Sequence, residues 1–175
     1  DVGWTAGAFW ETMGVDPMLG RLPTVADDLP EAPPILLISH GLWVSRFGSD
    51  PDVVGRTVTF DGESRTIVGV MPERFRVQLP PDALQSARTD VWAPRQWPYT
   101  EIPQAWRFFA LVGRLAPGAT VTAARDELRT VATDLEARHG EYGEATLSLL
   151  VEPLRESLAA PVRAPLVGVL VAAFL

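Results

Sequence analysis

Ser39 and His40 are adjacent and are of the residue types that hydrolases use as nucleophile and general base. A serine hydrolase needs its serine on a sharp exposed turn, commonly within Gly-x-Ser-x-Gly, and a histidine that approaches from a distant segment. No such motif surrounds Ser39, and neighbouring side chains usually point apart. We interpret Ser39 instead as the N-cap of a helix, and we predict that the chain has no catalytic residue and is not an enzyme.

The sequence contains no recognisable metal or cofactor site. Its second histidine, His139, is expected at the C-terminal end of a helix, where the helix dipole favours a cation. Two isolated histidines without any cysteine do not make a zinc site, and no glycine-rich phosphate motif occurs. The acidic pairs at 27–28 and 126–127 do not follow calcium-loop spacing, so we expect a solvated loop and a helix N-terminal turn there.

Six tryptophans could stack on sugars or on flat molecules, but their spread through the chain favours packing in a core or between lobes. Three aromatic residues in a proline-rich stretch are the candidates for an exposed contact with a partner. They are Trp97, Tyr99 and Trp106.

Length and charge limit the class of protein. The 175 residues are enough for one domain with two lobes. The net charge is -7 and all fifteen cations are arginine, without a basic run, which excludes nucleic acid as a partner. No cysteine is present, so there is no disulfide, and the first residues lack the features of a signal peptide.

The last twelve residues, 164–175, are uncharged and mostly apolar. They are too few to cross a bilayer, which takes roughly 20 residues. They fit either a C-terminal core helix or the start of a truncated transmembrane helix. Small residues at Gly168, Ala172 and Ala173 suit packing in lipid, and we favour the transmembrane interpretation.

Glycine and proline mark turns throughout residues 39–72. An apolar run at 35–38 predicts a buried strand, and the following helix has a stripe of Leu42, Trp43 and Phe47 and ends at Gly48. Segments 57–60 and 64–67 flank Asp61-Gly62 and predict a hairpin.

The hairpin register can be predicted from the strand period of two. A loop with an even number of residues puts Val58, Phe60 and Ile67 on one face. We expect an even loop, and with four residues in it Val58 lies opposite Ile67.

Outside this stretch, we predict a helix at 6–14, a solvated loop at 16–34 and strands at 90–93 and 108–115. The clearest helix is expected at 121–138, where apolar residues recur at steps of three and four behind a cap at Thr120 or Thr122. A strand at 146–151 would complete a strand–helix–strand crossover around that helix.

Eight segments in order carry a family resemblance. They are Met13-Gly-Val-Asp-Pro-Met-Leu-Gly-Arg21, Ser39-His-Gly-Leu-Trp43, Arg46-Phe-Gly48, Val54-Gly-Arg56, Asp61-Gly62, Val68-Gly-Val-Met-Pro72, Asp90-Val-Trp92 and Val112-Gly-Arg-Leu-Ala-Pro-Gly118. Over most of residues 8–158 the chain resembles the extracytoplasmic core domain of FtsX/MacB-type ABC transporter permeases, with the acidobacterial duplicated-permease branch most similar.

The resemblance implies an α+β fold with a porter-like βαβ lobe and a smaller second lobe, followed by the start of a transmembrane helix. It divides the chain into an extracytoplasmic core domain at 1–153, a connector at 154–163 and the start of a truncated transmembrane helix at 164–175. The first helix and opening strand of the family pattern are missing from the sequence, so we expect the core domain to be N-terminally incomplete.

The function that the resemblance implies is non-catalytic. Residues 1–153 would lie outside the cell (inner) membrane and couple the motion of transmembrane helices to the movement of a substrate or partner. The implied partners are a cytoplasmic ABC ATPase reached through the membrane helices, a second permease copy, and membrane lipid at the C-terminal tail. One alternative is an extracytoplasmic module that binds a ligand or a protein, and a less favoured one is a serine hydrolase.

Overall fold

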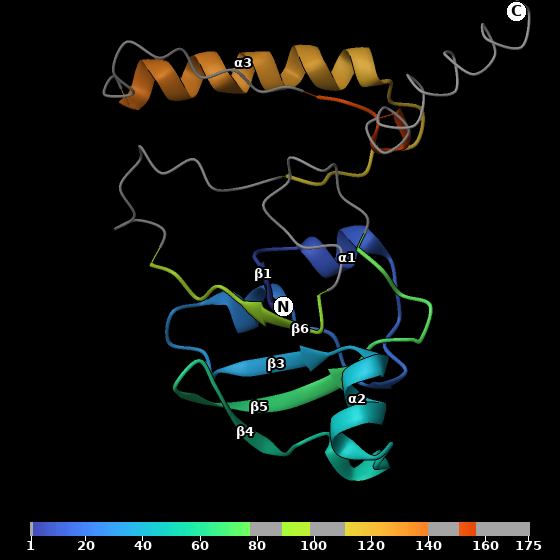
Figure 1. The fold of residues 1–175 in the computed structure, drawn as a ribbon. Helices are drawn as coiled ribbons and strands as arrows, with labels where there is room; N and C mark the ends of the chain where they lie inside the picture. Colours follow the sequence, from blue (N-terminus) through green and yellow to red (C-terminus); the bar gives the residue numbers. More distant parts are fainter. Residues whose placement is uncertain (1, 78–88, 99–110, 140–150, 157–175) are drawn as a thin grey trace, which may run out of the picture. The chain divides into compact units, whose positions relative to one another are not determined.

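The computed structural model describes residues 2–77, 89–98, 111–139 and 151–156 (Figure 1). They fall into two compact units. The first unit includes 2–77, 89–98 and 111–112, and the second includes 113–139 and 151–156.

The first unit is built on a mixed sheet, which has six strands among the described residues. Its strand order is β1-β6-β3-β5-β2, and β4 also pairs with β5. Two pairs are parallel, β1 with β6 and β3 with β5, whereas β3 and β6 are antiparallel. The strands are β1 (Val2–Thr5), β2 (Leu19–Gly20), β3 (Ile35–Ile38), β4 (Thr57–Phe60), β5 (Glu63–Val70) and β6 (Val91–Pro94). With helices joined to this sheet, the predicted α+β class is confirmed.

Strand β3 lies in the middle of the sheet, and all four of its apolar residues are buried, as predicted. Through helix α2 (His40–Phe47) and β4 it leads to β5, which runs parallel to it (Figure 1). A strand–helix–strand crossover therefore lies in residues 35–70. The crossover expected around 121–138 stays a prediction, because most of its second strand lies outside the described residues.

The prediction of a strand at 108–115 is wrong for residues 111–115, the part of it that the structure describes. Residues 111–115 adopt no regular secondary structure, and Leu111 is 81% exposed. A strand needs a partner for its backbone groups, and no described strand pairs with this segment. Residues 108–110 and most of the expected strand at 146–151 lie outside the described residues.

Helix α2 has the caps that its sequence predicts. The Ser39 hydroxyl accepts a hydrogen bond from the backbone N–H of Leu42 at 3.1 Å, and Gly48 closes the helix with a left-handed φ of 61°. The predicted stripe of Leu42, Trp43 and Phe47 packs, half-buried, against a core cluster that includes Ile38, Val53, Ile67 and Val70.

The β4–β5 hairpin has an even loop, as predicted, but the loop contains two residues. Asp61 (φ 53°) and Gly62 (φ 80°) both have positive φ, as a two-residue type I′ turn requires. Val58 consequently lies opposite Arg65, so the expected pairing with Ile67 is wrong. Val58 still packs on the core cluster that contains Ile67, because an even loop keeps both on one face.

The N-terminal part of the unit departs further from the sequence expectations. Helix α1 (Phe9–Met13) and its left-handed stop at Gly14 are confirmed. Strand β1 was not predicted. The loop at 16–34 is not simply solvated, since it contains β2 and a 3-10 turn, η1 (Val25–Asp28), in which Asp28 is only 7% exposed.

Two tryptophans occupy the core, as their spread suggested. Trp10 and Trp92 are buried and meet edge to face with ring centroids 5.9 Å apart, and Phe75 contacts both. This aromatic cluster links α1 to β6 within the first unit.

The second unit contains helix α3 (Val121–His139), close to the predicted 121–138. Thr120 caps it by accepting a hydrogen bond from the N–H of Ala123 at 3.1 Å. Arg125 donates from Nε to the carbonyl of Val151 at 2.9 Å, and residues 154–156 are helical. In the described parts of the chain no helix combines the length and apolarity needed to span a bilayer. The predicted helix start at 164–175 lies outside those parts.

Candidate functional site

The Ser39 hydroxyl is engaged as the cap of α2, as predicted. Its neighbour His40 turns its ring onto Trp43 instead, edge to face with centroids 5.5 Å apart. The two side chains thus serve the local structure of α2, each with its own partner.

Within the described ranges, no group of three or more histidine, aspartate or glutamate side chains is placed to hold a metal ion. His139 is the last residue of α3, which is the predicted position. Asp126 lies in the second turn of α3 instead of the first, and it pairs with Arg129 at 2.7 Å.

Trp97 belongs to a stack of arginine and tryptophan side chains in the first unit. The Arg95 guanidinium carbon lies 3.8 Å from the centroid of Trp97 and 4.8 Å from that of Trp4. The guanidinium carbon of Arg65 also lies near Trp4, 5.5 Å from its centroid. Cations over tryptophan faces attract the ring electrons, so this Arg–Trp stack connects β1, β5 and the residues after β6.

Tyr99 and Trp106 lie outside the described residues, so the contact patch with Trp97 stays a prediction. Trp97 itself is half-buried under Arg95.

Arg65 is a buried cation in the middle of the sheet, 7% exposed. Its Nη2 donates to the Glu63 carboxylate at 2.6 Å. Its Nε and Nη1 are also buried, and no hydrogen-bond acceptor for them lies among the described residues. The contact with the Trp4 ring therefore stabilises the Arg65 cation, because a buried guanidinium needs electron-rich neighbours in place of water.

Asp28 holds the ends of two strands together. Its carboxylate accepts hydrogen bonds from the backbone N–H of Gly7, just after β1, at 2.9 Å and from that of Gln96, just after β6, at 3.0 Å. Nearby, the N–H of Arg95 donates to the carbonyl of Thr5 at 2.9 Å. We call the Asp28 carboxylate, together with the N–H groups of Gly7 and Gln96 that it binds, the strand-end latch.

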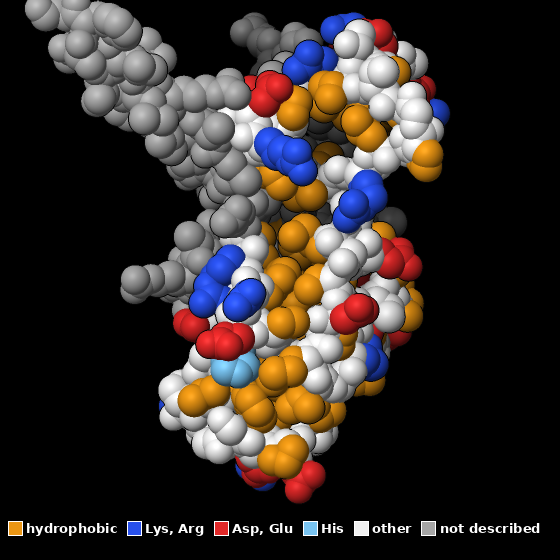
Figure 2. All heavy atoms as spheres, turned by 90° about the vertical axis from the view of Figure 1, so that its right-hand side faces the viewer, with side chains coloured by type: hydrophobic (Ala, Val, Ile, Leu, Met, Phe, Trp, Pro, Cys, Tyr) orange, Lys and Arg blue, Asp and Glu red, His pale blue; other side chains and the backbone are white. Residues whose placement is uncertain are grey.

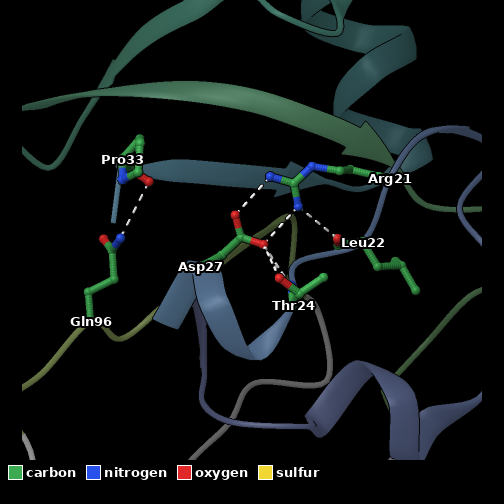
Figure 3. Close-up of polar contacts among 6 residues, drawn as sticks. All are labelled: Arg21, Leu22, Thr24, Asp27, Pro33 and Gln96. Atoms are coloured by element: carbon green, nitrogen blue, oxygen red, sulfur yellow. Dashed lines mark hydrogen bonds and ion pairs between the residues drawn. The ribbon is translucent and has the colours of Figure 1, made fainter. Parts of the chain in front are cut away.

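The Gln96 side chain extends the connection to a third segment. Its amide nitrogen donates to the carbonyl of Ala32 at 2.8 Å and to that of Pro33 at 3.4 Å, the second of which is drawn in Figure 3. Gln96 has a left-handed backbone, φ 51°, which is uncommon for a residue with a side chain.

An ion pair organises the turn beside β2 (Figure 3). The Arg21 guanidinium donates to both carboxylate oxygens of Asp27, at 2.7 and 2.8 Å, and the N–H and hydroxyl of Thr24 donate to the same carboxylate. The hydrogen bonds from Arg21 hold the pKa of Asp27 well below its usual range, and Asp27 in turn raises the pKa of Arg21. A bidentate pair of this kind fixes orientation as well as charge.

Hydrophobic side chains gather on the face of the first unit where α2 lies (Figure 2). The larger exposed ones around α2 and β2 are Met18 at 40%, Val44 at 45% and Val54 at 38%.

Comparison with known proteins identifies the family. The sequence matches the model of the MacB-like periplasmic core domain over residues 2–131. The chain belongs to this family. A search of curated proteins gave no significant match.

Two solved structures are similar to this MacB-like domain. The periplasmic region of MacB from Actinobacillus actinomycetemcomitans is 15% identical, with a TM-score of 0.47, and the match covers 78% of this chain and 56% of that one. A domain of a protein described as a permease, from Porphyromonas gingivalis, is 21% identical, with a TM-score of 0.44, over 90% of this chain and 70% of that one. The chain thus spans little more than half of the MacB region. The acidobacterial branch stays a prediction.

In this MacB-like domain, two of the resemblance segments meet at a pair of glycines. Gly20 of β2 lies opposite Gly69 of β5. A Cβ on Gly69 would lie 2.5 Å from the carbonyl oxygen of Arg21, and one on Gly20 would lie 2.1 Å from that of Val68. Both segments stand out in the sequence, but no local pattern in it indicates that they face each other.

Proposed function

We propose that this MacB-like domain is the extracytoplasmic, non-catalytic part of an ABC transporter permease at the cell membrane. In this role it moves as a packed body and couples the motion of transmembrane helices to a substrate or partner. A cytoplasmic ABC ATPase would drive that motion, and a second permease copy would complete the transporter.

The observation that carries this proposal, beside the family match, is how the resemblance segments are joined. Backbone hydrogen bonds connect Ser39 N–H to Asp90 at 2.8 Å, Arg21 N–H to Val68 at 2.9 Å and Met18 N–H to Val70 at 2.8 Å. These segments therefore form one hydrogen-bonded sheet with α2 packed on it. A body that transmits motion needs this kind of rigidity, because a loose one would absorb the displacement.

The remaining parts of the proposal rest on the sequence. Residues 154–163 would serve as the connector, and 164–175 would begin a transmembrane helix in contact with lipid. A stiff connector is essential to the idea, since a flexible one would let the helix move without the domain.

The test uses the full-length permease in its own host, with the connector altered at Pro161. Two glycines inserted after Pro161 should abolish the transport phenotype that deletion of the permease also abolishes. Two alanines inserted at the same place are the matched control, because they add the same length but favour a helix and should retain more function. Membrane abundance of both variants is measured by immunoblot.

If the glycine variant transports as well as the wild type at equal abundance, the coupling role is wrong. A loss that is equal in both variants would also count against it, because length and not stiffness would then be decisive.

A further inference from the structure

Strand β1 is held more firmly than its length of four residues suggests. It pairs in parallel with β6, from Val2 opposite Val91 to Thr5 opposite Pro94. The pairing continues past the strand, where the Arg95 N–H donates to the Thr5 carbonyl at 2.9 Å. The Thr5 hydroxyl adds a contact to the carbonyl of Ala93 at 3.4 Å.

Two further sets of interactions join β1 and the residues after it to other parts of the first unit. The strand-end latch places the buried Asp28 carboxylate between the N–H groups of Gly7 and Gln96. In the Arg–Trp stack, Trp4 of β1 contacts the guanidinium groups of both Arg65 and Arg95. Hydrogen bonds to a carboxylate are stronger than those between neutral groups, so the latch reinforces the C-terminal end of the pair.

The direction of the strands determines how this pair bears tension. Because β1 and β6 are parallel, a pull on residue 1 against residue 98 acts along the strands in opposite senses. The inter-strand hydrogen bonds are then loaded together, in shear. A pull on residue 1 against residue 90 acts at the same end of both strands and breaks the bonds one after another.

We propose that the β1–β6 pair, locked by the strand-end latch, is a mechanical clamp that lets the first unit carry tension from its N-terminal strand without unfolding. The clamp deepens the proposed function, on which its biological use rests. Tension applied before Val2 would pass into β6 by shear, and residues 6–90 would be shielded from it until the pair ruptures.

The test is single-molecule force spectroscopy on the whole 175-residue chain. The chain contains no cysteine, so two introduced cysteines give unique attachment points. Asp1→Cys with Pro98→Cys loads the pair in shear, and Asp1→Cys with Asp90→Cys loads it for unzipping. We expect a rupture force several-fold higher in shear, followed by an extension of roughly 300 Å as the residues between the handles are released.

Asp28→Asn tests the latch, because one amide oxygen cannot accept both N–H bonds in the geometry of a carboxylate. The rupture force in shear should fall, whereas the unzipping force should stay as in the wild type, since unzipping starts at Val2, far from the latch. Asp52→Asn makes the same change at an exposed aspartate of the same unit and should change neither force.

Equal rupture forces in the two pulling directions, with Asp28 unchanged, would overturn the clamp, and this comparison needs only the cysteine attachment points. A fall of both forces in Asp28→Asn by the same factor would show that Asp28 is only structural and would remove the latch from the proposal. Neither measurement involves transport, so a failed clamp and a failed coupling role are told apart by which experiment fails.

Discussion

The ion pair of Arg21 and Asp27 is the clearest electrostatic contribution among the described side chains. Asp27 is nearly buried and accepts four hydrogen bonds, two from Arg21 and two from Thr24, while the Arg21 side chain is 52% exposed. The pKa of the Asp27 carboxyl is lowered, chiefly by the hydrogen bonds from Arg21. In the unfolded chain the same carboxyl would titrate near its ordinary value of about 3.9.

The substitution Asp27→Asn should lower the free energy of unfolding at pH 7 by about 1 kcal/mol, a value reduced by the exposure of Arg21 to water. A lowered folded-state pKa stabilises the fold above the unfolded pKa, and this contribution is lost as the pH falls toward the folded one. The difference in free energy of unfolding between the wild type and Asp27→Asn should therefore become smaller as the pH falls from 5 to 2. Urea unfolding followed at several pH values measures it.

Asp52→Asn provides the comparison, because Asp52 is an exposed aspartate and its substitution should leave the free energy of unfolding nearly unchanged. A gap for Asp27→Asn that stays constant down to pH 2 would contradict the assigned cause.

At the residue level, some roles follow from neighbours in sequence and others do not. The Ser39 cap was predictable because its partner, Leu42, is three residues away. The burial of Asp28 was not, since its donors lie 21 and 68 residues away, and the sequence showed only an acidic pair in a polar loop.

Among the elements, the approach of β2 to β5 depends on the absence of a side chain. A Cβ on Gly69 would meet the carbonyl oxygens of Arg21 at 2.5 Å and Leu19 at 2.9 Å, and a Leu37 methyl at 3.0 Å. Because two of these neighbours are backbone atoms, the strands would have to separate.

We expect Gly69→Ala to destabilise the fold by about 2 kcal/mol through this overpacking. Gly41→Ala is the same change in α2, where the nearest atom to the new Cβ is the Ser39 hydroxyl at 3.9 Å, and it should stabilise by about 0.5 kcal/mol through helix propensity. Thermal and urea unfolding of both variants measures the difference. Two variants of equal stability would show that β2 does not need the close approach.

The elements that were predicted carry local signals, and those that were missed do not. Helix α3 has a cap, a periodic apolar face and nineteen residues. The hairpin has Asp61-Gly62, although the number of loop residues depended on φ angles that the sequence leaves open. Strand β1 has four residues with a glycine among them, and its only described strand partner is β6, some 89 residues away, so no local pattern indicates it.

For the whole molecule, the sheet order predicts where the first unit is most stable. Strand β3 has a partner on each side, and its residues are 0 to 4% exposed, whereas the residues of β4 are exposed or half-buried at the edge. Amide hydrogens of β3 should exchange only with global unfolding, and those of β4 should exchange sooner through local opening. Hydrogen–deuterium exchange with mass spectrometry compares the two. Equal protection of β4 and β3 would mean that the hairpin and the central strand open as one unit.

The pairing of β1 with β6 also determines the order in which strands can pair during synthesis on the ribosome. Strands β3, β4 and β5 come from a continuous stretch, residues 35–70, and can pair soon after they leave the ribosome. Strand β1 is made before these three strands, yet it must wait for residues 91–94, which at 5 to 20 residues per second takes about 5 to 20 s. Throughout that interval the backbone edge of β1 is open to any strand nearby, so within the first unit the nascent chain is most exposed to mispairing at β1.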